Sequence, residues 1–241
     1  MNKIWIIARR ELNSYFDSLI AYLMIIIFLG LGGFFTWLFG NNIFIINQAS
    51  LGVFFGISYW TLFFFIPAIT MRAIAEENRS GTIELLTTKA VSDMQIVTGK
   101  FLGSFLLVII ALICTIPYFV TVAWLGPLDY GATFGGYLAL ILASGAYIAI
   151  GIFASSSTSN QIVAFLMALF ISLFFHLLFD ILASTSSGVV GSVLSYLSAR
   201  THFESLSRGV IDSRDIIYFL SILGLGLVMA SMILSKRNWE K

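Results

Sequence analysis

The chain has 241 residues, of which 59% are hydrophobic and only 10% are charged. Soluble domains average about 25% charged residues, so a soluble monomer could not bury this much apolar surface. The net charge of +1 gives no case for nucleic-acid binding, and the lone cysteine excludes a disulfide framework or a cysteine metal cluster.

Apolar stretches of the length needed to cross a bilayer recur along the whole chain. They cover residues 19–39, 53–71, 101–124, 134–154, 161–183 and 216–234. We therefore predict an all-α integral membrane protein with six transmembrane helices in a single membrane domain, 1–241. The first stretch is interpreted as an uncleaved anchor, because it is longer than the apolar region of a signal peptide and no small-residue cleavage site follows.

The positions of Lys and Arg predict the orientation of the spans. The N-terminal segment carries three basic residues, the connection after the second span four and the C-terminal tail three, whereas residues 40–52 and 125–133 carry none. Both termini are therefore expected in the cytoplasm. The connection before the last span is the exception, since it holds Arg200, Arg208 and Arg214, although three acidic residues bring its net charge to zero.

Residues 1–18 show the pattern of an amphipathic helix ahead of the first span. Trp5, Ala8, Leu12, Tyr15 and Phe16 recur at three- and four-residue spacing, with polar residues opposite. This pattern predicts an elbow helix lying on the inner leaflet. It either serves as a simple topological anchor or transmits motion to the first span.

The connection 72–100 is the most polar segment on the predicted cytoplasmic side. Arg72, Glu76 and Arg79 are spaced to support a helical continuation of the second span, which Gly81 would end. A short amphipathic piece follows at 82–88, and Ser92 with Gln95 forms a capping box for the next helix. Such a connection is either a solvated loop or a docking element for a cytoplasmic partner.

The residues of this connection resemble the cytoplasmic signature of type-2 ATP-binding-cassette (ABC) exporter permeases. The resemblance rests on Glu-Glu-x-Arg-x-Gly-Thr-x-Glu-Leu-Leu from Glu76, followed by Gly99-Lys100-Phe101. In that family this connection enters a groove on the ATPase subunit. The resemblance therefore implies an ATPase-coupling role for nine residues: Glu76, Glu77, Arg79, Gly81, Thr82, Ile83, Glu84, Leu85 and Leu86.

A second stretch, from Phe203 to Asp212 with Tyr218 and Phe219 ahead of the last span, is similar to one branch of that family. The branch contains the permease for nitrous-oxide-reductase maturation and the gliding-motility permease, and the likeness is nearest to the latter. The resemblance implies a location in the bacterial cytoplasmic (inner) membrane.

The chain carries no phosphate-binding loop for ATP. Its one Gly-Lys pair, Gly99 and Lys100, has Met94 where the first glycine of the loop should stand and Phe101 where the hydroxyl should be. We therefore expect no enzyme activity and no cofactor in this chain, with ATP and Mg used by a separate ABC ATPase subunit. The family resemblance implies a second permease copy or a related permease, and leaves room for a periplasmic or membrane accessory subunit.

His176 and Asp180 stand four residues apart toward the outer end of the fifth span, and therefore on one helical face. An ionisable pair inside a membrane is a functional hypothesis by default. They form either a structural hydrogen-bonded pair or a contact for a substrate or a proton. Two such ligands do not make a metal site, so no metal is predicted.

The outer segment 184–215 is long for a bundle with short connections. Val189, Val190 and Val193 recur at helical spacing, which predicts either a re-entrant helix or an interfacial helix on the outer leaflet. Its charged signature residues and glycine are candidates for an outer gate: Glu204, Arg208, Gly209 and Asp212. Asp212 or Ser213 is expected to cap the last span, with Asp215 in its first turn favoured by the helix dipole.

Three classes of function fit a chain of this composition. The first is the permease of an ATP-driven complex, associated with gliding motility or with the maturation of a periplasmic copper enzyme. An ion- or proton-coupled secondary carrier would need ionisable groups at the midplane, where this chain has almost none. An intramembrane enzyme would need more polar groups at membrane depth than His176 and Asp180 supply.

Overall fold

The computed structural model describes residues 3–40, 43–81 and 91–237, and all regular structure within these ranges is helical. The prediction of an all-α membrane protein is confirmed, since six helical segments of the described chain are long and apolar enough to cross a membrane. The first span is α2 (Ile20–Gly33), continued by the π-helix η1 (Phe34–Leu38), and the second is α4 (Gly52–Thr70). The third is α7 (Asp93–Ile113), continued by α8 (Ile116–Leu125), and the fourth is α9 (Tyr130–Ser156). The fifth is α10 (Gln161–Leu173), continued by the π-helix η2 (Phe174–Leu178) and by α11 (Phe179–Thr185), and the sixth is α14 (Ser213–Arg237).

Five shorter helices complete the described fold. They are α1 (Lys3–Asp17) before the first span, α3 (Ile43–Ile46) and α5 (Ala75–Ser80) beside the second, and α12 (Gly188–Leu197) and α13 (Ala199–Ser207) before the last. The elbow segment predicted from the sequence is thus helical, with Ala8 and Tyr15 buried.

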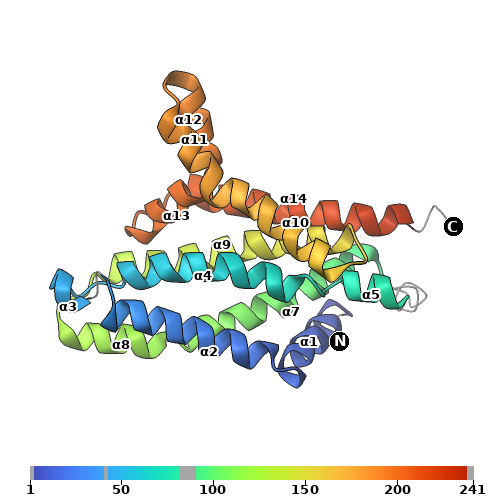
Figure 1. The fold of residues 1–241 in the computed structure, drawn as a ribbon, viewed down its shortest axis with the longest axis horizontal. Coiled ribbons are helices and arrows are strands. Elements are labelled where there is room, and N and C mark those ends of the chain that lie inside the picture. Colours follow the sequence, from blue (N-terminus) through green and yellow to red (C-terminus); the bar gives the residue numbers. More distant parts are fainter. Residues whose placement is uncertain (1–2, 41–42, 82–90, 238–241) are drawn as a thin grey trace.

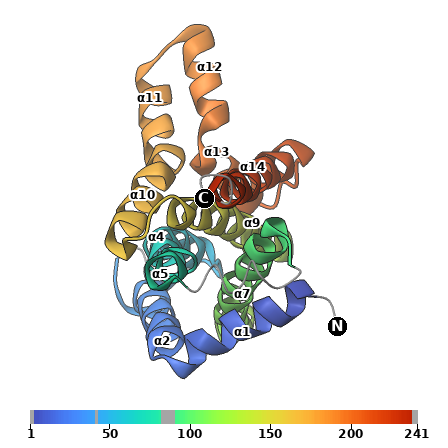
Figure 2. The ribbon, with the colours of Figure 1, turned by 90° about the vertical axis from the view of Figure 1, so that its right-hand side faces the viewer.

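The helix α9 forms the centre of the bundle, with α4, α7, α10 and α14 around it (Figure 2). In its most apolar 18-residue stretch 78% of the residues are buried inside the protein, compared with 22% in the corresponding stretch of the first span. The helix is rich in Gly, Ala and Ser, and small side chains let neighbouring backbones approach closely where lipid provides no hydrophobic drive between helices. The sequence of α9 therefore suits a central position.

The bundle has two ends of different character (Figure 1). The helices α1 and α5 and the C-terminal end of α14 lie at one end, and α3, α8 and α13 lie at the other. We name them the inner end and the outer end, after the orientation that the distribution of Lys and Arg predicts.

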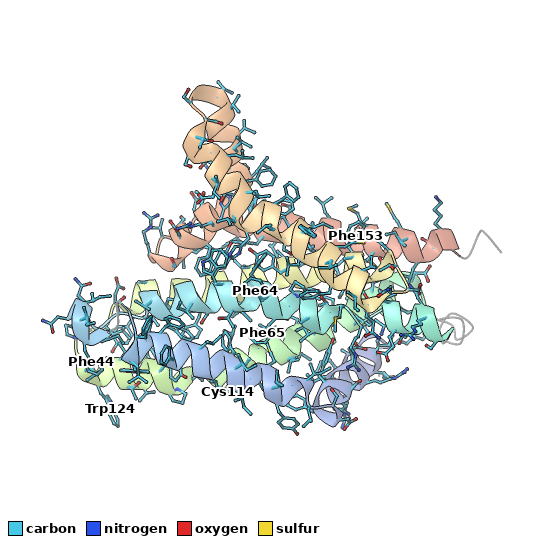
Figure 3. The ribbon with its side chains drawn as sticks, viewed as in Figure 1. Phe44, Phe64, Phe65, Cys114, Trp124 and Phe153 are labelled. Atoms are coloured by element: carbon cyan, nitrogen blue, oxygen red, sulfur yellow. The ribbon has the colours of Figure 1, made fainter. Side chains whose placement is uncertain are left out.

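The pair α11 and α12 stands away from the bundle as a helical hairpin (Figures 1 and 2). Val189, Val190 and Val193 of α12 are exposed on it. Apolar side chains are also exposed elsewhere around the bundle, and Cys114 and Trp124 project away from it (Figure 3). Such a perimeter matches a hydrocarbon environment.

Candidate functional site

The extension of the second span at the inner end has the helix and the break that the spacing predicts. The helix α4 ends at Thr70, a turn of four residues follows, and α5 runs from Ala75 to Ser80. Gly81 ends α5 in the left-handed conformation (φ 69°), which glycine adopts without steric cost. The rest of the predicted coupling residues, Thr82, Ile83, Glu84, Leu85 and Leu86, lie outside the described residues.

The two consecutive glutamates of α5 point to different partners. Glu76 is exposed and pairs with Arg72, the Arg72 Nε lying 3.2 Å from the Glu76 Oε2. Arg79 is also exposed. Glu77 turns inward, with its Oε1 2.9 Å from the Nζ of Lys100. The coupling residues predicted as one set are therefore divided between an exposed face and a buried contact.

Lys100 is the centre of a buried charged cluster that links three helices. Its side chain is only 3% exposed, although a lysine is almost never fully buried unless paired. The Nζ lies 3.2 Å from the Glu11 Oε2 of α1 and 2.9 Å from the Glu77 Oε1 of α5. One ammonium of α7 thus stands between carboxylates from two other helices.

Close packing of α1 on α7 depends on two glycines one helical turn apart. A Cβ on Gly99 would lie 2.7 Å from the Ile7 side chain, and a Cβ on Gly103 would lie 2.6 Å from the Cβ of Glu11. Real Cβ contacts are longer, so a larger residue at either position would push α1 away. Gly99 therefore supplies the close approach that lets its neighbour Lys100 reach Glu11.

Tyr15 adds a polar contact between α1 and the spans. Its hydroxyl lies 2.9 Å from the Oγ of Ser104 and 3.2 Å from the carbonyl oxygen of Ile69, so it can accept from the first and donate to the second. Burial, together with the nearby Glu11 carboxylate, raises the pKa of the Tyr15 phenol above its ordinary value. The hydroxyl therefore stays protonated and remains a donor.

Ser155, at the inner end of α9, holds the start of α5. Its Oγ accepts from the backbone N–H groups of Ile74 and Ala75, each at 3.0 Å, and donates to the carbonyl oxygen of Met71 at 3.0 Å. These N–H groups stand at the beginning of a helix, where no intrahelical acceptor exists. One buried hydroxyl thus fixes the turn between α4 and α5 to the central helix.

At the outer end, His176 and Asp180 do not form the pair expected from their spacing. The Nδ1 of His176 lies 2.9 Å from the hydroxyl of Tyr147, whereas Asp180 contacts Arg200 at 3.4 Å. His176 belongs to the π-helix η2 and Asp180 to the helix α11 that continues it. The two side chains serve separate contacts, although Arg200, which binds Asp180, lines the same cavity as His176.

His176 is buried in an aromatic box. Its ring stacks between Tyr59, at a centroid distance of 4.2 Å, and Phe63, at 4.4 Å. The hydroxyl of Tyr147 donates to that of Tyr59, so the Tyr147 oxygen is free to accept from the Nδ1–H of His176. The Nε2 has no partner among the described residues.

This box forms one wall of a cavity of about 230 Å³. The cavity brings together residues that are far apart in the sequence, from α4, η2 and α13: Tyr59, Trp60, His176, Arg200, Phe203 and Glu204. It joins His176 to Glu204, one of the gate candidates. The guanidinium of Arg200 binds Glu204 at 2.8 Å, and this hydrogen bond raises the pKa of Arg200 above its ordinary value.

The other gate candidates lie around the C-terminal end of α13 and the start of α14. Arg208 pairs weakly with Glu204 at 3.8 Å and is exposed, and Gly209 takes a positive φ of 86° against the start of α9. The Asp212 carboxylate accepts from the N–H of Arg214 at 2.9 Å, which confirms the expected cap of the last span.

Sequence reasoning missed a second buried histidine contact at this end. The Nδ1 of His202 lies 2.6 Å from the Oδ1 of Asp215, and its Nε2 lies 2.9 Å from the carbonyl oxygen of Tyr196. Asp215 therefore has a buried partner beyond the helix dipole. No pattern in the sequence links positions 202 and 215, because the contact joins two helices at an angle that the chain alone does not set.

At the inner end the missed residues are Glu11, Tyr15 and Ser155, each a polar residue on an otherwise apolar face. The sequence held one signal for Glu11. Gly99 and Gly103 are four residues apart and allow another helix to pack closely on α7, where a carboxylate can reach Lys100.

Among the described residues no group of three or more His, Cys, Asp or Glu side chains is placed to hold a metal ion.

Comparison with known proteins agrees with this architecture. The sequence model of the family described as ABC-2 family transporter protein matches residues 47–234, which is most of the chain. No curated protein matches the chain. The matched range runs from just before α4 to the last turns of α14 and contains α5 and Lys100. The chain belongs to the ABC-2 transporter family and is a multi-pass membrane protein.

Proposed function

We propose that the chain is the permease subunit of an ATP-driven ABC complex and receives its energy from a separate ATPase at the inner end. The observation that carries the proposal is α5, a polar helix that continues the second span and presents Glu76 and Arg79 to solvent. Family membership supports a permease subunit that works with an ABC ATPase.

The contacts of α5 suit an element that receives force. Ser155 binds its first backbone groups to α9, and Glu77 binds it to Lys100 of α7. A movement of α5 would therefore act on the central helix and on the third span as well as on the second. A flexible solvated loop would have no such attachments.

The experiment is co-purification of the chain with an ABC ATPase from its native membrane. We expect a nucleotide-binding subunit in the wild-type complex, and its loss when residues 82–88 are deleted or when Gly81 or Glu84 is changed. Glu204→Gln, at the outer end, is the matched control and should retain the ATPase. A complex that survives the deletion and both substitutions would exclude this docking site.

The same proposal includes the setting of the complex. Two permease copies, or this chain with a related permease, would stand with two ATPase subunits in a bacterial inner membrane, and ATP and Mg would bind only to the ATPase. Mass measurement of the intact complex tests this stoichiometry. A single permease copy in an active complex would contradict it.

For the biological process we propose an association with gliding motility, on the likeness of the stretch from Phe203 to Asp212 to the gliding branch. Permeation for copper-enzyme maturation is the competing assignment. The partners that co-purify distinguish them, because a large periplasmic or membrane partner supports the first, and copper-enzyme maturation proteins support the second.

A further inference from the structure

We propose that Lys100, Glu11 and Glu77 position the elbow helix α1 so that it moves together with α5 when the ATPase acts. The inference rests on the proposed function and adds a path for the motion. It assigns Glu77 to an internal contact, whereas the neighbouring Glu76 stays available to the partner.

The geometry of the cluster shows which helices the motion would pass through. Lys100 is on α7, a continuous helix of 21 residues, and its ammonium reaches Glu77 on one side and Glu11 on the other. The side chains of Glu11 and Glu77 are 18% and 15% exposed, so both ion pairs are largely shielded from water. Charge pairs of this kind interact more strongly than pairs on the surface.

The charges of the cluster do not balance. Two carboxylates share one ammonium, and the Oε2 of Glu77 is buried without a hydrogen-bond partner among the described residues. If the Lys100 ammonium follows a displaced Glu77, it moves away from the Glu11 carboxylate. The elbow helix must then follow as well, or a buried ion pair is broken, which is strongly unfavourable.

The packing of α1 joins it to two spans. It packs closely on α7 across Gly99 and Gly103, and its Tyr15 hydroxyl contacts Ser104 of α7 and the Ile69 carbonyl of α4. Through Lys100, the charged cluster adds a link from α1 to α5. A purely structural anchor would need no link to α5.

The test measures two distances in the complex with its ATPase. The native cysteine is removed by Cys114→Ser, and spin labels are placed on exposed positions through Asn13→Cys on α1, Ser80→Cys on α5 and Lys236→Cys on α14. Pulsed electron paramagnetic resonance then follows the pairs 13–236 and 80–236 without nucleotide and with ATP trapped by vanadate. Labelled and unlabelled chains are mixed so that each complex carries one labelled copy.

We expect both distances to change with nucleotide in the wild-type background. In Glu77→Gln, which keeps the shape of the side chain, the change at 80–236 should remain and the change at 13–236 should be lost. Asp17→Asn, which neutralises an exposed carboxylate of α1 outside the cluster, is the control and should keep both changes. The triple exchange of Glu11→Lys and Glu77→Lys with Lys100→Glu reverses all three charges, keeps both pairs attractive and should restore the change at 13–236.

Glu11→Gln removes the charge of the ion pair between α1 and Lys100, and it serves as the second variant if Glu77→Gln does not assemble. A change at 13–236 that persists in either variant would overturn the inference, as would a wild-type complex in which only the pair 80–236 responds. Both results would leave the proposed function intact. Absence of an ATPase from the wild-type complex would instead contradict the proposed function itself.

Discussion

The inner and outer ends of the bundle use different interactions to join their helices. At the inner end, α1, α5 and α7 meet around the buried ammonium of Lys100, and charged groups carry the junction. At the outer end, α4, η2 and α13 meet through the stacked rings around His176, and the charged groups Arg200 and Glu204 stay partly exposed. The comparison contrasts a three-helix junction held by a buried ammonium with one held by stacked rings, while the buried Asp215 carboxylate of the outer end lies outside that aromatic junction.

Stacked rings tolerate a change of charge, because their energy comes from contact area and dispersion. A buried ion cluster does not, because removal of one member leaves the others desolvated and uncompensated. The inner junction should therefore be sensitive to single charge substitutions, and the outer aromatic box should be less so. The following substitutions test this contrast by their effect on the free energy of unfolding in detergent.

The largest effect is expected for Lys100→Met. The substitution leaves the Glu11 and Glu77 carboxylates buried beside each other, and breaking a buried ion pair from one side costs about 3–5 kcal/mol. Reversible unfolding in a denaturing detergent measures it. A loss no larger than that of an exposed pair would show that water fills the cluster and that the inner junction is not held by charge.

A smaller effect is expected for Asp215→Ala at the outer end. It leaves the Nδ1 of the buried His202 without its partner, and a buried polar group left unsatisfied costs about 1–3 kcal/mol. The same unfolding measurement applies, with Arg214→Ala as a nearby exposed control. Equal losses for Asp215→Ala and Lys100→Met would remove the contrast between the two ends.

Ser155→Ala should have an effect of similar or slightly smaller size at the inner end. It removes the acceptor of two buried backbone N–H groups and leaves both without a partner, so about 1–3 kcal/mol is expected. Ser155→Thr keeps the hydroxyl and serves as the control. Faster hydrogen exchange at residues 74–75 in Ser155→Ala would locate the effect, and unchanged exchange there would contradict it.

The smallest effect on stability is expected for Glu76→Gln. Its pair with Arg72 is exposed, and exposed pairs contribute about 0–1 kcal/mol. Binding of the ATPase, measured by co-purification, should fall more than stability does. A large loss of stability without a change in ATPase binding would reverse the roles proposed for Glu76 and Glu77.

How much of the candidate site was predictable differs between its parts. Arg72, Glu76, Gly81, Ser92 and Gln95 act through contacts within a few residues of the chain, so spacing alone predicted the extension, its break and the capping box. His176 and Asp180 show the limit of such reasoning, because their partners, Tyr147 and Arg200, belong to other helices.

The sequence by itself determined that the protein lies in a membrane, and it determined the six spans and the polar extension of the second span. Each of these follows from composition and from local periodicity. Only the tertiary structure decided which polar groups meet: Lys100 with Glu11 and Glu77, Ser155 with the start of α5, and His202 with Asp215. Most of these partners are far apart in the chain, and all belong to different helices whose crossing is set by side-chain packing. Helix periodicity fixes which face a residue occupies, whereas the neighbour of that face depends on how all the helices pack together.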